Sequence, residues 1–173
     1  VGPYRTMVEA VAMRTSGLGG DSEVHFASEG LSGGVTLGPK RVLPLSLMAH
    51  EAPDVVLPAL AKQLRASMLG KFDGMFVRAL SGIDSGGLNE RDIDVLGRIG
   101  HRTQPLGEVL KTRMEASSLR RLVERGLVQV GGLTPSDASH ALGGLDLWNH
   151  EAAIIGLKLF GRRRTGSSDQ LAV

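Results

Sequence analysis

The feature that most constrains the fold is a cluster of glycines near the start of the chain. Three of the four residues from Gly17 to Gly20 are glycine, and an Asp and a Ser follow directly. Because glycine adopts positive φ without steric cost, this segment can turn sharply and leave backbone N–H groups uncovered. Residues 6–15 before it and residues 23–27 after it favour strands. We therefore expect a strand, a glycine-rich loop and a return strand.

Helical and strand-like patterns alternate along the following residues, which predicts an α/β or α+β fold. Short strands are expected at residues 35–37 and 41–43, around a Gly-Pro pair. A helix is expected from Pro53, with apolar residues at helical spacing, and Gly70 ends it. Residues 74–80 then favour another strand.

The segment Ser81–Gly87 is the best internal boundary, because it is rich in glycine and serine. Beyond it we expect one helix capped by Asn89, a second at residues 106–110 and a third at residues 117–125. A short strand at residues 127–130 follows. Three helices followed by a β-wing is the order of a winged helix-turn-helix.

Two further helices are expected, one with Thr134 as N-cap and Pro135 at the first helical position, and one at residues 147–161. The chain should therefore divide into four parts. These are a mixed strand and helix part at residues 1–88, a winged-helix-like subdomain at 89–133, C-terminal helices at 134–164 and a disordered tail at 165–173.

The absence of cysteine excludes a disulfide framework and thiolate metal sites, and it agrees with a reducing cytosol. The formal net charge is only +2, so charge alone indicates no anionic partner. No apolar run reaches the roughly 18 residues that would span a bilayer, and no signal-peptide pattern occurs. We therefore expect a cytoplasmic protein with no membrane partner.

Four segments in the same order carry a resemblance to a known family. They are Arg5–Ser22 with the glycine loop, Leu37–Leu47 (LGPKRVLPLSL), Arg121–Leu127 (RLVERGL), and Leu133–Gly143 (LTPSDASHALG), which Trp148 and Glu151 continue. In these segments the chain resembles the hydantoinase A/5-oxoprolinase family. The resemblance implies the acetate-and-sugar-kinase/actin-like ATPase fold and the ATP-dependent opening of a small cyclic amide.

The resemblance further implies ATP and Mg²⁺ as cofactors, activation of a carbonyl group by ATP and a hydantoinase B-type partner subunit. The family's D-x-G-G-T and G-G-T-x-T-D loops do not occur in this chain, which begins at Val1. We therefore expect an internal or C-terminal fragment that needs the rest of its subunit, binds neither ATP nor Mg²⁺ itself and is inactive alone. A related ATP-dependent ketone carboxylase subunit is an alternative, because that group is similar in sequence.

The resemblance makes the glycine loop the leading candidate site. Asp21 is the candidate catalytic residue, and Gly17, Gly19, Gly20 and Ser22 are the candidate substrate- or phosphate-binding residues. The alternative is a plain hairpin turn, in which Gly and Asp are turn formers. The functional interpretation predicts that Gly19, Gly20 and Asp21 lie at an exposed concavity.

Asp137 and His140 form a second candidate site, because residues three apart on a helix share a face. Two ligands do not define a metal site, and the metal is unknown. The alternative is structural, with an Asp favoured by the helix N-terminus and a histidine that is satisfied within the fold.

A nucleic-acid-binding module is the rival hypothesis from a different class. Residues 102–125 include six basic and three acidic side chains, and Arg120, Arg121 and Arg125 fall on the helix that would enter a major groove. The segment lacks interleaved aromatic residues and Asn or Gln base readers. We therefore expect a compact helical subdomain without a nucleic-acid partner.

Overall fold

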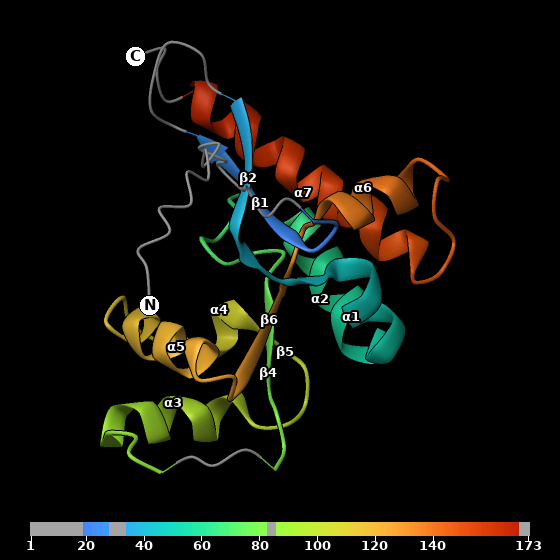
Figure 1. Ribbon diagram of the computed structural model, residues 1–173. Helices are drawn as coiled ribbons and strands as arrows, with labels where there is room; N and C mark the ends of the chain where they lie inside the picture. The colour runs from blue at the N-terminus through green and yellow to red at the C-terminus, as the bar shows by residue number, and fades with distance from the viewer. Residues whose placement is uncertain (1–18, 28–33, 83–85, 170–173) are drawn as a thin grey trace, which may run out of the picture.

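The computed structural model describes residues 19–27, 34–82 and 86–169 (Figure 1). Within these ranges the chain forms a mixed α/β fold with seven helices, a two-stranded sheet and a mixed four-stranded sheet. The strand expected at residues 6–15 lies outside the described residues. No described helix has the length and apolar character needed to cross a membrane.

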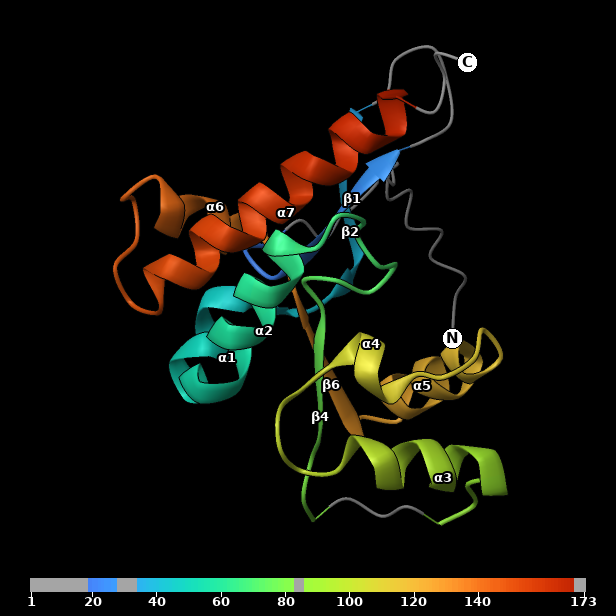
Figure 2. The same cartoon turned by 180° about the vertical axis from the view of Figure 1, so that it is seen from behind.

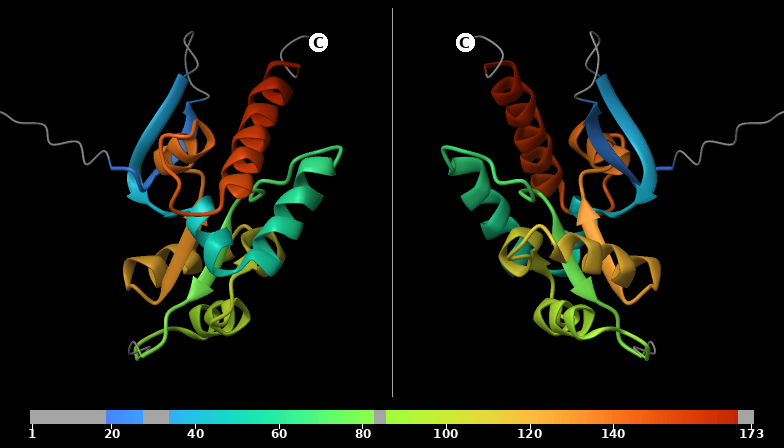
Figure 3. Two further views of the ribbon diagram at one scale, coloured as in Figure 1. Left: turned by 90° about the vertical axis from the view of Figure 1, so that its right-hand side faces the viewer. Right: turned by 90° about the vertical axis from the view of Figure 1, so that its left-hand side faces the viewer.

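The two-stranded sheet is an antiparallel hairpin of β1 (Ser22–Ala27) and β2 (Gly34–Arg41), with Val24 opposite Leu37. The hairpin is joined to the rest of the fold at its base. There the Val24 N–H donates to the Leu133 carbonyl at 3.2 Å. Figure 3 shows the hairpin on the opposite side of α7 (His150–Asp169) from α2 (Pro53–Arg65).

The four-stranded sheet has the order β3 (Leu43–Pro44), β6 (Val128–Gly132), β4 (Phe76–Ala79), β5 (Gln104–Pro105). β3 runs parallel to β6, and β4 is antiparallel to both β6 and β5. The sheet therefore takes strands from both sides of the boundary expected near residue 88. The division into domains stays a prediction, but its first two parts share a sheet.

One core lies where α1 (Leu45–Glu51), α2 and α7 pack around Met48, Leu60, Phe76 and Leu159. A glycine in α7 permits this close packing. A Cβ at Gly156 would lie 2.6 Å from Leu45 Cδ1 and 3.3 Å from Leu133 Cδ1. α7 continues to Asp169, so the helix end expected at residue 161 is wrong.

A second core lies between the other end of the sheet and α3 (Glu90–Ile99), α4 (Leu106–Val109) and α5 (Glu115–Glu124) (Figure 2). Val77, Ile99 and Leu122 are fully buried in it. The Asn89 side chain accepts the Asp92 N–H at 2.9 Å, which confirms the expected N-cap of α3.

The three helices and the following strand occur in the expected order, but the expected β-wing is wrong. β6 pairs with β4, which precedes α3, and the chain then enters α6 (Pro135–Ala141) without a return strand. Gly131 and Gly132 continue β6, and the absence of a side chain at Gly131 allows close packing there. A Cβ at Gly131 would lie only 2.7 Å from Met48 Cγ.

Candidate functional site

The glycine loop closes on itself at its end. The Gly19 N–H donates to Ser22 Oγ at 3.0 Å, and the Ser22 N–H donates to the Gly19 carbonyl at 3.0 Å. Ser22 is buried, so its hydroxyl serves the turn and does not face solvent. Gly17 lies outside the described residues, and the contribution expected from it stays a prediction.

Asp21 lies at the surface beside a cation. Its carboxylate is 3.4 Å from the Arg41 guanidinium, and the two side chains are 41% and 68% exposed. Asp21 is therefore not buried in a core, whereas the concavity expected around it stays a prediction, and its described ionic partner is a residue that sequence analysis did not single out. The N–H groups of Gly20 and Asp21 make no hydrogen bond to the described residues.

A side chain at either described glycine of the loop would displace a neighbouring polar side chain. A Cβ at Gly19 would lie 2.7 Å from Asp21 Oδ1, and one at Gly20 would lie 2.6 Å from Ser136 Oγ. The Gly20 carbonyl accepts hydrogen bonds from Ser136, from the N–H at 3.1 Å and from Oγ at 2.7 Å. The start of α6 therefore holds the loop in place.

Asp137 is fully buried and joins two helices. Its Oδ2 accepts from the Leu45 N–H at 3.1 Å and from the N–H and hydroxyl of Thr134, each at 2.9 Å. Its Oδ1 accepts from the N–H of Ser46 at 2.8 Å and from the hydroxyl of Ser46 at 2.6 Å. The carboxylate completes the capping box of α6 and also caps the N-terminus of α1. The structural interpretation of Asp137 is confirmed.

His140 is also fully buried, but the hydrogen bonding of its ring differs from that of the Asp137 carboxylate. Both ring nitrogens lack a hydrogen-bond partner among the described residues, and the ring lies 5.3 Å from the Trp148 ring. The expectation that this histidine is satisfied within the fold finds no support among the described residues and stays a prediction. Its backbone carbonyl is hydrogen-bonded to Nδ1 of His150 at 2.8 Å. In the described part of the chain no three His, Cys, Asp or Glu side chains could hold a metal ion together.

Two of the three arginines expected to face a major groove bond to other residues of the chain. Arg121 donates to both carboxylate oxygens of Asp92 at 2.9 and 2.6 Å. This pairing holds the pKa of the Asp92 carboxyl below its usual value, against the opposing effect of burial. Arg125 donates to the Gly86 carbonyl at 2.6 Å, whereas Arg120 is exposed.

A parallel arrangement joins the first turn of α5 to α3. Arg98 donates to Glu115 at 2.8 Å, and the Glu115 carboxylate also accepts the N–H groups of Lys111 and Thr112. The hydrogen bond from Arg98 lowers the pKa of Glu115 below its usual value. Glu115 thus fixes the turn before α5 as well as the packing of α3.

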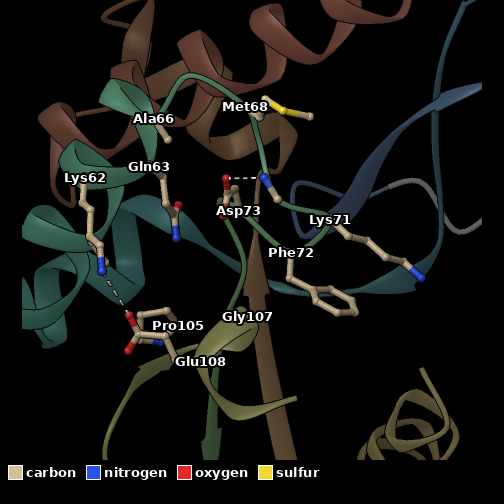
Figure 4. Close-up of a pocket in the computed structure, with 12 residues that line it drawn as sticks. Lys62, Gln63, Ala66, Met68, Lys71, Phe72, Asp73, Pro105, Gly107 and Glu108 are labelled. Carbon is tan, nitrogen blue, oxygen red and sulfur yellow. Dashed lines mark hydrogen bonds and ion pairs between the residues drawn. The ribbon is translucent and has the colours of Figure 1, made fainter. Parts of the chain in front are cut away.

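A surface pocket that sequence analysis missed lies between α2, the segment after it and α4 (Figure 4). Its volume is about 420 Å³. Lys62 and Glu108 form an ion pair at 3.8 Å at one side, and Asp73 accepts the Gly70 N–H. Lys71 points away from Lys62 in Figure 4, so the two lysines do not converge on one ligand group.

Comparisons with known proteins add no identification, because no family model, no curated protein and no solved structure matches the chain. The candidate site is therefore judged on its geometry. The structure joins the Asp21 loop to Arg41 and Ser136, and it assigns Asp137 to the support of that region.

Proposed function

We propose that this chain is part of an ATP-dependent subunit of the hydantoinase A/5-oxoprolinase type, which opens cyclic amides. The parent fold would be the acetate-and-sugar-kinase/actin-like ATPase fold, with α3, α4 and α5 as a helical subdomain of it. A hydantoinase B-type partner and the rest of the subunit would complete the catalyst.

One observation carries the proposal. Three of the four segments with the family resemblance lie together, although they are far apart in sequence. The loop segment contacts the segment Leu133–Gly143 through the bonds from Ser136 to Gly20. The segment Leu37–Leu47 contacts the loop through the Val42 N–H bond to the Asp21 carbonyl at 2.9 Å. It contacts α6 through the bonds to Asp137.

This arrangement gives the resemblance a physical basis. Segments that resemble the family but lay far apart in the fold could not contribute to a single site. Here Asp137 is buried and fixes the start of α6, where Ser136 bonds to the loop, and the Asp21 side chain is partly exposed. Such support would hold a carboxylate in a fixed position, as catalytic geometry requires.

The described residues do not fit a resident magnesium ion. No set of three acidic, His or Cys side chains converges among them, and Asp21 is beside Arg41. ATP and Mg²⁺, which the resemblance implies, would therefore be held by the remainder of the subunit. The role left to this chain is to bind the amide and to orient it.

The nucleic-acid alternative has less support. A groove-reading helix needs free cations along its exposed face. Arg121 is instead committed to Asp92 and Arg125 donates to a backbone carbonyl, while Arg120 is exposed. No described contact favours the ketone carboxylase alternative over the hydrolase, and the resemblance alone keeps it open.

The test is an assay of the complete subunit with its partner, in which ATP hydrolysis and opening of a cyclic amide are measured together. We expect ATP hydrolysis to rise when the amide is added and the isolated 173-residue chain to show neither activity. Phosphoryl transfer depends on several converging groups, and the two phosphate-binding sequence motifs that the resemblance requires do not occur in this sequence. If the complete protein opened the ring without ATP, the proposal would be wrong.

A further inference from the structure

The loop that joins α6 to α7 presents apolar side chains to solvent. Leu142 is 86% exposed and Leu147 is 66% exposed. The loop is held at both ends, because the Gly144 N–H donates to the Ser139 carbonyl at 2.8 Å and the Asn149 N–H donates to a carbonyl of α1 at 3.1 Å. Two exposed leucines on one short loop of fixed shape indicate a contact surface.

The pocket between α2 and α4 is a hollow that such a loop could enter. Its volume of about 420 Å³ lies within the roughly 300–1,000 Å³ of pockets that hold drug-sized molecules, so it has room for a leucine side chain. Ala59, Met68, Phe72 and Pro105 contribute apolar surface to its lining. None of the described residues that line it belongs to the loop between α6 and α7, which Figure 2 shows at the far left, with α4 right of centre.

The loop and the pocket each carry one charged side chain that has no ion pair among the described residues. On the loop this is Asp146, which is exposed and precedes Leu147. At the pocket it is Lys71, whose ammonium group lies 5.3 Å from the centre of the Phe72 ring. In Figure 4 the Lys71 side chain extends away from the ion pair at the other side of the pocket. Opposite charges at these two places would favour contact and fix its register.

We propose that the loop between α6 and α7 docks into the pocket between α2 and α4 of a second copy of this chain. Leu142 and Leu147 then cover the apolar lining of that pocket, and Asp146 pairs with Lys71. This inference is independent of the proposed function. Because the loop and the pocket are different surfaces, the contact is head-to-tail, and its repetition forms a ring or an open chain of copies.

The contact should be weak, because one loop in one pocket buries less than the roughly 1,200 Å² of a stable interface. Sedimentation velocity of the 173-residue chain should show monomers at about 10 µM and larger species near about 1 mM. The double substitution Leu142→Ser, Leu147→Ser should raise the Kd at least roughly tenfold. Ile93→Ser is the matched control, because Ile93 on α3 is 57% exposed but lies outside both surfaces, and it should leave the Kd unchanged.

An exchange of charges tests whether the loop meets this pocket. Asp146→Lys alone and Lys71→Asp alone each bring like charges together at the contact, so each should weaken association at least roughly tenfold. A mixture of the two variants brings opposite charges together at every contact and should associate as the unchanged chain does. Both residues are exposed, and the NMR spectrum of each variant verifies that the fold is retained.

The inference is supported only if the single charge variants stay monomeric and their mixture associates. A chain that remains monomeric at every concentration would overturn it, and so would a mixture that remains monomeric. Association that persists in both charge variants, or that Ile93→Ser weakens as much as the leucine substitutions do, would place the contact on another surface and reject the proposal.

Discussion

At Asp137, one carboxylate accepts N–H groups from the first residues of α1 and from the N-cap of α6. The sequence pattern predicted the Thr134 cap and Pro135 at the first helical position, because capping depends on neighbouring residues. The bonds from Asp137 to Leu45 and Ser46 could not be predicted in this way, since they join residues about ninety positions apart. The same is true of the ion pair between Arg41 and Asp21, which depends on the register of the hairpin.

Replacing Asp137 with Asn should destabilise the fold by about 3 kcal/mol, because an amide NH₂ would face N–H donors in a buried site. Urea denaturation measures the change. The matched control is Asp146→Asn in the exposed segment between α6 and α7, which should change stability by less than about 0.5 kcal/mol. A similar small effect at both positions would contradict the capping role of Asp137.

The pKa values of Asp92 and Glu115 predict how the stability of the fold changes when the pH is lowered. Their pKa values in the folded state lie below the ordinary values of 3.8 and 4.5, since each carboxylate is paired with an arginine. The stabilisation is therefore present above the unfolded-state pKa values and is lost as pH falls through the folded-state values. Urea unfolding between pH 2 and 6 should show stability falling at the acid end, with a smaller slope in Asp92→Asn. An unchanged slope in that variant would count against this account.

Among the elements, α7 shows how packing decides where glycine is needed. Gly156 faces Leu45 and Leu133 at distances that a Cβ would make too short, whereas nothing lies within 4 Å of a Cβ at Gly161. Local patterns predicted the helix itself, but they could not distinguish these two glycines. For β6, the local pattern predicted the strand correctly. It could not identify the partner strand β4, which lies about fifty residues away in the sequence.

Gly156→Ala should destabilise the protein by about 1–2 kcal/mol, because the overpacking cost exceeds the gain in helix propensity. Gly161→Ala is the matched control in the same helix and should stabilise it by about 0.5–1 kcal/mol. Thermal or urea unfolding of the two variants gives opposite signs if the packing is as described. Stabilisation by both substitutions would show that α7 does not approach Leu45 closely.

At the scale of the whole molecule, the two cores meet along one sheet, and the candidate site lies at the base of the hairpin, beside α6. The mixed α/β class follows from alternating local patterns and was predicted. The shared sheet was not, because strand pairing between distant segments leaves no local signal. The central claim for the molecule is that the loop at Asp21 works as part of a larger ATP-dependent catalyst.

The most direct test of that claim is the steady-state turnover of the complete subunit and its partner with Asp21→Ala. We predict a loss of at least roughly tenfold, about 1.4 kcal/mol of transition-state stabilisation. The matched variant Lys40→Met should keep full turnover, because Lys40 lies outside the proposed site. Unchanged turnover in Asp21→Ala, or clear ATP hydrolysis by the isolated 173 residues, would contradict the account.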